Sequence, residues 1–241
     1  MSRIWQLILL AMASLPFRAV PAIAQTADSL VILSFNVREW TRDTDESKDT
    51  YWKRRMEAME KMIGDVDPDV ICLQEVLPPV GRYIPDGYKS AGLSVSHPIY
   101  IRKTLKSSGH RFSIFWESCS VSGIKIINVH SRWEAKIVAR TVEQVNGQLT
   151  GKDVACGDWN TFLKNINEVG LKMESARVIL GIPEEDTFAN FSRPTESHGA
   201  IDHFFVNGLT PLSYEMITEG YGVPKISDHY PIVLKIKILA D

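Results

Sequence analysis

Val154-Ala155-Cys156-Gly157-Asp158-Trp159-Asn160 places a short apolar run directly before an acidic residue and an amide. Such a run predicts a buried strand, with the polar residues lying where that strand ends. Near the C-terminus, Ser227-Asp228-His229 stands just before a second apolar run, which begins at Ile232. Strand ends that deliver carboxylate, amide and imidazole groups can hold a divalent cation and a phosphate together. The two segments therefore predict a site for phosphate chemistry.

Polar groups able to bind metal or transfer protons also follow or begin other strand-like runs. The six positions are Asn36, Glu75, His130, Asp158 with Asn160, Asp202, and Asp228 with His229. A single residue of this kind beside a strand is most often a turn residue or a hydrogen-bonded side chain. Their recurrence along one chain favours a shared functional site.

The apolar runs alternate with helical patterns, and no break divides the chain. Two amphipathic helices are predicted by apolar residues at helical spacing, namely Trp52, Met56, Met59 and Ile63 in the first and Val138, Val142 and Val145 in the second. Phe112-Ser113-Ile114-Phe115 has the appearance of an antiparallel strand. Interleaved strands and helices predict one α/β domain.

The composition fits a single globular domain with a sizeable core, because 44% of the 241 residues are apolar. The formal net charge of −2 creates no global field toward nucleic acid or anionic membranes, which weakens these partners without excluding them. Three cysteines leave at least one unpaired and match no zinc pattern. We expect a monomer without a disulfide framework.

Residues 1–24 have the parts of a secretory signal peptide. Arg3 provides the positive charge, Ile4 to Leu15 the apolar stretch, and Ala22-Ile23-Ala24 the cleavage pattern. We therefore expect cleavage near Ala24, export to the periplasm or the medium, and a catalytic domain over residues 25–241. The apolar stretch is short for a bilayer span, so no stable membrane insertion is expected. An uncleaved N-terminal anchor is the alternative.

The chain resembles the endonuclease/exonuclease/phosphatase superfamily through motifs in the family's order. These motifs are Ser34-Phe35-Asn36, Leu73-Gln74-Glu75, Asn128-Val129-His130, Gly157-Asp158-Trp159-Asn160, Ile201-Asp202-His203 and Ser227-Asp228-His229. The segments Trp52-Lys53-Arg54-Arg55, Phe115-Trp116-Glu117-Ser118 and Ala139-Arg140 further resemble its secreted bacterial branch. The resemblance implies a four-layer α/β sandwich, in which two mixed β-sheets pack face to face with helices outside.

The resemblance also assigns the metal ligands and the phosphate-binding groups. Glu75, Asn36 and Asp228 are the implied ligands of Mg²⁺, with Mn²⁺ or Ca²⁺ as alternatives. Cations for one or two substrate phosphates could come from Arg38, Arg132 or Arg140. Arg38 stands where repair endonucleases of the superfamily carry an Asp, which argues against that branch.

The implied catalytic residues are His229, His130, Asp158, Asn160 and Asp202. His229 would act as the base or polarise the phosphate, with the carboxylate of Asp202 on its other ring nitrogen. Asp158 and Asn160 would orient the attacking water and bind the phosphate. His130 would bind phosphate or protonate the leaving group, so the assignment of acid and base between the two histidines stays open. His203 is left outside this set.

The sequence thus predicts an exported, metal-dependent phosphoesterase that cleaves a phosphodiester or phosphomonoester by histidine-assisted attack of water. Its substrate would be a phosphorylated small molecule, a lipid head group or a nucleic acid. A secreted nuclease acting on DNA or RNA is one alternative, although the basic clusters Lys53-Arg54-Arg55 and Arg102-Lys103 are short. A catalytically silent phosphate-binding domain on the same scaffold is the other.

Overall fold

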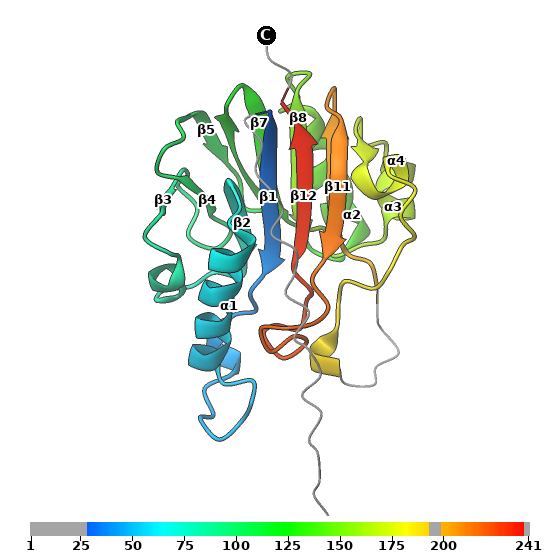
Figure 1. Cartoon of the computed structure of the whole chain (residues 1–241). Coiled ribbons are helices and arrows are strands. Elements are labelled where there is room, and N and C mark those ends of the chain that lie inside the picture. Colours follow the sequence, from blue (N-terminus) through cyan, green and yellow to red (C-terminus); the bar gives the residue numbers. More distant parts are fainter. Residues whose placement is uncertain (1–27, 193–198, 239–241) are drawn as a thin grey trace, which may run out of the picture.

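The computed structural model describes residues 28–192 and 199–238, which form two mixed six-stranded sheets (Figure 1). The first sheet has the order β11-β12-β1-β2-β4-β3 and contains β1 (Ser29–Asn36), β2 (Val70–Gln74), β3 (Tyr88–Ser90), β4 (Ile99–Arg102), β11 (Pro211–Met216) and β12 (Ile232–Lys237). The second has the order β5-β6-β7-β8-β10-β9 and contains β5 (Ser107–Phe112), β6 (Trp116–Val121), β7 (Ile124–His130), β8 (Asp153–Asp158), β9 (Glu174–Ser175) and β10 (Asp202–Asn207).

Helices cover the outer faces of the two sheets. The helical elements are α1 (Trp52–Val66), α2 (Ala135–Asn146), α3 (Leu163–Val169), α4 (Ala176–Ile179) and the short 3₁₀ turns η1 (Trp40–Arg42), η2 (Val80–Tyr83) and η3 (Asn190–Ser192). The apolar stripe of α1, which includes Met56 and Met59, packs on the first sheet. Val138 and Val142 of α2 pack on the second. Both predicted helices are confirmed.

The main core lies between the two sheets. Ile32 and Cys72 from the first sheet pack in one buried cluster with Cys156 and Phe204 from the second. A second cluster lies between the first sheet and its helices, and a third lies between the second sheet and its helices. The order of layers is therefore helix, sheet, sheet, helix. This arrangement confirms the predicted four-layer α/β sandwich.

Strand directions bring the polar strand ends to one edge of the sandwich. β1 runs parallel to β2 in the first sheet, and β7 runs parallel to β8 in the second. The hydrogen bond between Asn36, at the end of β1, and Asp158, at the end of β8, brings the carboxyl ends of both pairs to the same edge. β10 is antiparallel to β8 and pairs Asp202, at its start, with Asp158 at the end of β8. β12 is antiparallel to β1, which places the segment before Ile232 at the same edge. We call this edge, where the predicted catalytic residues lie, the catalytic end.

One predicted strand is wrong. Phe112 is the last residue of β5, and residues 113–115 form the connection to β6. Phe112 and Ile114 are exposed, so their alternation with polar residues does not reflect a buried sheet face.

All three cysteines are buried and free.

The predicted signal peptide lies outside the described residues. Within the part of the chain that the structure describes, no helix combines the length and the apolar character needed to cross a bilayer.

Gly157 allows β7 and β8 to approach closely just below the catalytic end. Its φ is +129°, and a Cβ there would lie 2.0 Å from the carbonyl oxygen of Val129. We expect Gly157→Ala to lower the free energy of unfolding by at least about 3 kcal/mol, through backbone strain and displaced strands. Urea denaturation measures the change.

Gly64→Ala is the matched control, because this exposed position in α1 has no atom within 4 Å of the added Cβ. It should stabilise the chain by about 0.5 to 1 kcal/mol, since alanine restricts the unfolded chain more than glycine does. Equal stability of both variants would show that β7 and β8 tolerate a side chain here.

Candidate active site

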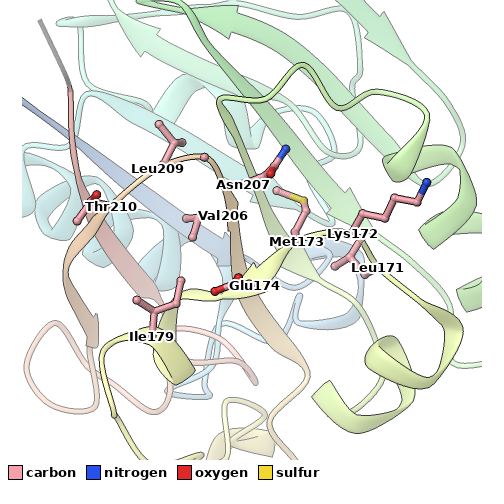
Figure 2. A pocket seen from close by; sticks show the side chains of 10 residues that line it. Leu171, Lys172, Met173, Glu174, Ile179, Val206, Asn207, Leu209 and Thr210 are labelled. Atoms are coloured by element: carbon pink, nitrogen blue, oxygen red, sulfur yellow. The ribbon is translucent and has the colours of Figure 1, made fainter.

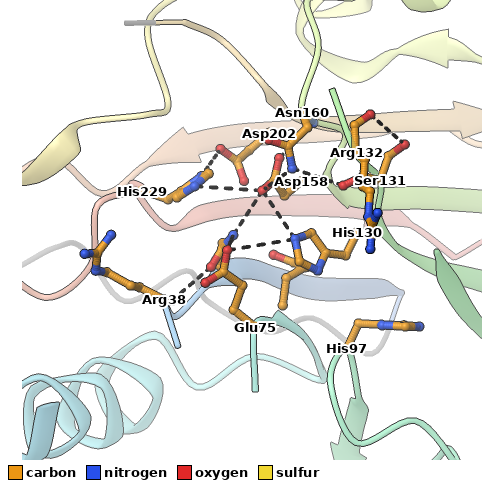
Figure 3. A network of polar contacts seen from close by, with 12 residues as sticks. Arg38, Glu75, His97, His130, Ser131, Arg132, Asp158, Asn160, Asp202 and His229 are labelled. Carbon is orange, nitrogen blue, oxygen red and sulfur yellow. Dashed lines mark hydrogen bonds and ion pairs between the residues drawn. The ribbon is translucent and has the colours of Figure 1, made fainter. Parts of the chain in front are cut away.

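Asp158, at the end of β8, is the centre of the polar network (Figure 3). Its Oδ2 accepts hydrogen bonds from Nδ2 of Asn36 and Nδ2 of Asn160, both at 3.0 Å. The same oxygen lies 3.8 Å from Nε2 of His229 and 3.9 Å from Nε2 of His130. The side chain of Asp158 is fully buried, so these polar neighbours replace water.

Glu75 follows β2 with a left-handed backbone (φ 58°), which turns the chain at the sheet edge. Its Oε1 accepts a hydrogen bond from Nδ2 of Asn36 at 3.3 Å, and its Oε2 accepts the backbone N–H of Glu39 at 2.9 Å. Burial alone would raise the pKa of Glu75, but these hydrogen bonds and the nearby His130 hold it below its usual value. Glu75 is therefore an anion that shares the amide of Asn36 with Asp158.

His229 and Asp202 form a buried hydrogen-bonded pair. Nδ1 of His229 lies 2.8 Å from Oδ2 of Asp202, and Phe188 packs edge-on against the imidazole with its centroid 5.0 Å away. The hydroxyl of Thr187 donates to the same Asp202 oxygen at 2.7 Å and accepts the Asp202 backbone N–H at 2.9 Å. Asp202 thus fixes the ring of His229 and leaves Nε2 pointing toward Asp158.

Acidic neighbours dominate the protonation of the site. Burial would lower the pKa of His229, but Asp202, Asp158 and Asp228 raise it to about 10. Burial and the charge of Asp202 raise the pKa of Asp158 to about 7, against the opposing effect of His229. In this arrangement His229 carries a proton at neutral pH, and Asp158 can take one up.

His130, at the end of β7, lies on the other side of Asp158 (Figure 3). Its Nε2 is 4.0 Å from Oε1 of Glu75, and a quarter of its side chain is exposed. Desolvation lowers its pKa, and Glu75 only partly offsets this, so His130 is neutral near pH 7. The two histidines therefore differ in charge.

Arg38 and Asp228 pair with each other. Nη1 of Arg38 lies 2.5 Å from Oδ2 of Asp228, while its Nε binds Asp43 at 2.8 Å and its guanidinium lies over the ring of Phe191. Asp228, a predicted metal ligand, is thus already bound to a cation. Arg38 is 19% exposed and reaches the border of the site.

The other predicted cations lie further out. Arg132 is exposed on the connection after β7, close enough for its charge to act on His130. Arg140 is exposed on α2 and has no contact with the site among the described residues. The structure thus joins all five predicted catalytic residues with Glu75 and Asn36 in one network, while the third predicted metal ligand, Asp228, lies beside His229 and pairs with Arg38.

A family model described as "Endonuclease/Exonuclease/phosphatase family" matches residues 33–229. The chain belongs to this family. The match contains every residue of the network described above. A search of curated proteins gave no match.

Solved structures share the fold of this family member. An endonuclease/exonuclease/phosphatase from Bacteroides vulgatus is 17% identical, with a TM-score of 0.73 over 88% of this chain and 99% of that one. TDP2 from D. rerio, solved with a single-strand DNA product, is 18% identical with a TM-score of 0.67 over 86% and 98%. A mannosyl-6-phosphatase from Bacteroides thetaiotaomicron is 18% identical with a TM-score of 0.65 over 86% and 99%.

Two supports of this endonuclease/exonuclease/phosphatase site were missed from sequence. Thr187 comes from a polar stretch with no strand pattern, next to Phe188, which forms isolated β-bridges. The Thr187 hydroxyl orients Asp202 through a hydrogen bond. Gln74 and Asn128 join the two sheets beneath the site, with Nε2 of Gln74 donating to Oδ1 of Asn128 at 2.7 Å. Both residues of this pair belong to quoted motifs, but the sequence alone gives no local signal that these two buried amides bind each other.

A cavity whose lining side chains are shown in Figure 2 lies away from the catalytic end. It has a volume of about 450 Å³ and is lined by Leu171, Lys172, Met173, Glu174, Ile179 and residues 206–210. Asn207, at the far end of β10, borders it, whereas Asp202 begins that strand. No predicted site residue lines this cavity.

His203 is a packed side chain rather than a catalytic one. It is 2% exposed, and its Nε2 lies 3.0 Å from the carbonyl oxygen of Thr161. Burial lowers its pKa to about 4, so between pH 6.5 and 4 the unfolded chain takes up a proton that the folded chain does not. Its neutral form therefore stabilises the fold above pH 6.5, and this contribution is lost as the pH falls.

We expect His203→Gln to reduce the acid sensitivity of this family member. From pH 7 to pH 5, the free energy of unfolding of the variant should fall by about 2 kcal/mol less than that of the wild type. Urea titrations at both pH values measure this, with the exposed His110→Gln as the control. Parallel losses in all three proteins would contradict the assignment.

Proposed function

We propose that this chain is an exported, divalent-metal-dependent phosphoesterase that cleaves a phosphodiester or phosphomonoester bond by attack of water. The observation that carries the proposal is the contact of Asp158 with the His229–Asp202 pair on one side and with Asn36 and His130 on the other. General acid–base groups and an anionic ligand set thus meet at one strand edge.

The donor set fits a hard divalent cation. Glu75 and Asp158 present oxygen atoms close to one amide, and among the described residues no lysine or arginine forms an ion pair with either carboxylate. Glu75 and Asn36 would hold Mg²⁺, or Mn²⁺ or Ca²⁺ in its place, and the bound cation would polarise the phosphate oxygens. Asp158, Asp202 and His229 also offer ligand atoms within 4.8 Å of one another.

The cluster of Asp158, Asp202 and His229 fits proton transfer better than metal binding. Nδ1 of His229 is engaged by Asp202, and an imidazole that is protonated at neutral pH has no lone pair for a cation. We therefore place the cation at Glu75 and Asn36 and keep the second group for acid–base chemistry.

The protonation states suggest a role for each side chain. Asp158, with a pKa of about 7, would accept a proton from the attacking water, which Asn160 would help to orient. His229 would stabilise the negative charge of the phosphate as an imidazolium, held by Asp202. A neutral His130 fits a hydrogen bond to the phosphate better than protonation of the leaving group.

For the substrate we favour a phosphorylated small molecule or head group over a nucleic acid. Arg55 is buried and binds backbone carbonyls, so the Lys53-Arg54-Arg55 cluster does not form a basic stripe. Arg102 pairs with Asp67 and Asp69. A secreted nuclease is the second candidate, supported by the fold shared with TDP2 in complex with a DNA product.

A substrate panel tests the proposed activity. Purified residues 25–241 would be given bis-p-nitrophenyl phosphate, p-nitrophenyl phosphate, plasmid DNA, sphingomyelin and inositol phosphates, each with Mg²⁺ and with EDTA. We expect hydrolysis that EDTA abolishes and Mg²⁺ restores. If no substrate is hydrolysed under either condition, the silent phosphate-binding domain becomes the better reading.

Export has its own test, which does not depend on turnover. The full-length chain would be expressed in a bacterium, and the protein in the periplasm and medium would be analysed by mass spectrometry. We expect a mature N-terminus at Gln25. An intact chain that stays with the cytoplasmic membrane would instead indicate the uncleaved anchor.

A further inference from the structure

Exposed apolar side chains surround part of the catalytic end. Among the described residues, six of the ten large apolar side chains that are exposed lie at this end: Leu93, Val95, Ile114, Trp133 and Phe162 on connections and Phe112 at the last residue of β5. We call these six residues the apolar rim. Exposure reaches 78% for Ile114, 76% for Trp133 and 69% for Leu93. Large apolar groups gathered at one end of a molecule mark an interaction surface.

Buried polar groups hold the rim in place. Glu117 is 1% exposed, and its Oε1 accepts the backbone N–H groups of Leu93 and Ser94. Its Oε2 accepts the N–H of Ile99 at 3.2 Å, so one carboxylate fixes both ends of the segment that presents Leu93 and Val95. These side chains therefore point outward from an anchored backbone.

The rim is also continuous with the catalytic network. Nε2 of His97 lies 3.2 Å from the carbonyl oxygen of Ser113, which joins the segment of Leu93 to that of Ile114. The carbonyl of Phe115 accepts the backbone N–H of His130 at 2.8 Å. Asn160 donates to the carbonyl of Ser131 at 3.1 Å, which joins the segments of Trp133 and Phe162. The four segments thus form an arc on the His130 side of the site.

The chemistry of the rim fits a neutral lipid surface. Half of the rim is aromatic, but Leu93, Val95 and Ile114 are aliphatic. These three side chains offer no stacking face to a nucleobase and can enter the acyl region of a bilayer. The segments that carry the six rim residues, 91–98, 112–115, 131–134 and 159–162, contain one Arg and one Glu, so these segments carry no net charge. The exposed tryptophan of the rim, Trp133, suits the boundary of head groups and acyl chains.

We propose that the apolar rim docks the catalytic end onto a zwitterionic phospholipid surface. Docking would place His130 and the neighbouring carboxylates against phosphoesters presented at that surface. The contact is peripheral, because only side chains of loops enter the interface. It concerns binding alone, so it can be measured without turnover and stands apart from the proposed phosphoesterase activity.

Vesicle sedimentation tests this inference. Residues 25–241 would be centrifuged with sucrose-loaded phosphatidylcholine vesicles, with Mg²⁺ and with EDTA. We expect the wild type to sediment under both conditions, and we expect replacement of a fifth of the lipid by phosphatidylserine to bring no increase. The double variant Leu93→Ser with Ile114→Ser should bind at least about tenfold more weakly, because each change removes a large apolar side chain from the interface.

Leu212→Ser is the matched control, since Leu212 is also exposed but lies at the start of β11, at the opposite end of the sheet. It should sediment like the wild type. The double variant should keep its circular dichroism spectrum and its turnover of soluble bis-p-nitrophenyl phosphate.

The inference fails if the wild type stays in the supernatant or if the double variant sediments equally well. It also fails if Leu212→Ser loses as much binding, or if soluble turnover falls in step with binding, which would make the rim a wall of the substrate site.

Discussion

His229→Ala is expected to lower kcat on whichever phosphoester the panel identifies by roughly 100- to 10,000-fold. The imidazolium of His229 is held 2.8 Å from Asp202, and its other nitrogen faces Asp158. Its removal deletes the positive charge that would stabilise the phosphate and leaves Asp202 buried without its partner. KM should change less than kcat, because the interaction strengthens as charge develops on the phosphate. Steady-state kinetics with saturating Mg²⁺ measures both.

Two further variants separate chemistry from folding. Asp202→Asn keeps the size of the side chain but removes the charge that holds His229, so its activity should lie between those of the wild type and His229→Ala. His110→Ala changes an exposed histidine of β5 and should retain full activity. A folded His229→Ala protein with near wild-type kcat would remove His229 from the catalytic set.

The fold and most of the site could be predicted because both depend on strand ends. Three of the buried strands end at a polar residue that lies at the sheet edge, namely Asn36, His130 and Asp158. Parallel pairing aligns the ends within each sheet, and the packing of the two sheets face to face then brings the two sets together. Glu75 lies one residue beyond β2, and its turn at positive φ was not visible in the sequence.

The parts that sequence did not predict depend on contacts between distant segments. Arg38 and Asp228 are 190 residues apart, and only the folded chain shows that they neutralise each other. Thr187 supports Asp202 from a segment without periodicity. Phe112 and Ile114 flank the polar Ser113 as in a strand with one apolar face, yet both apolar side chains are exposed and Ile114 lies in the connection between β5 and β6. An alternation pattern records which side chains are apolar, and it cannot tell a core face from an interaction surface.

Glu75→Gln is expected to lower metal-dependent turnover by roughly 1,000-fold, because a bound cation contributes several kcal/mol to phosphoester hydrolysis. The amide keeps the shape of the side chain and can still accept the backbone N–H of Glu39. The substitution removes a carboxylate that accepts a hydrogen bond from Asn36. Unlike Asp202, this carboxylate does not hold a histidine in place. The Mg²⁺ concentration for half-maximal activity should rise, and excess Mg²⁺ should restore part of the rate.

A readout without catalysis distinguishes loss of the cation from other defects. Mg²⁺ should raise the Tm of the wild type, since binding to the folded state alone stabilises it, and should raise the Tm of Glu75→Gln much less. His229→Ala should retain the Mg²⁺-dependent rise, because His229 is assigned to the phosphate and not to the metal. Glu57→Gln, on the exposed face of α1, should behave as the wild type in both assays. An equal rise in Tm for Glu75→Gln and the wild type would place the cation elsewhere, and the cluster of Asp158, Asp202 and His229 would then be the next site to test.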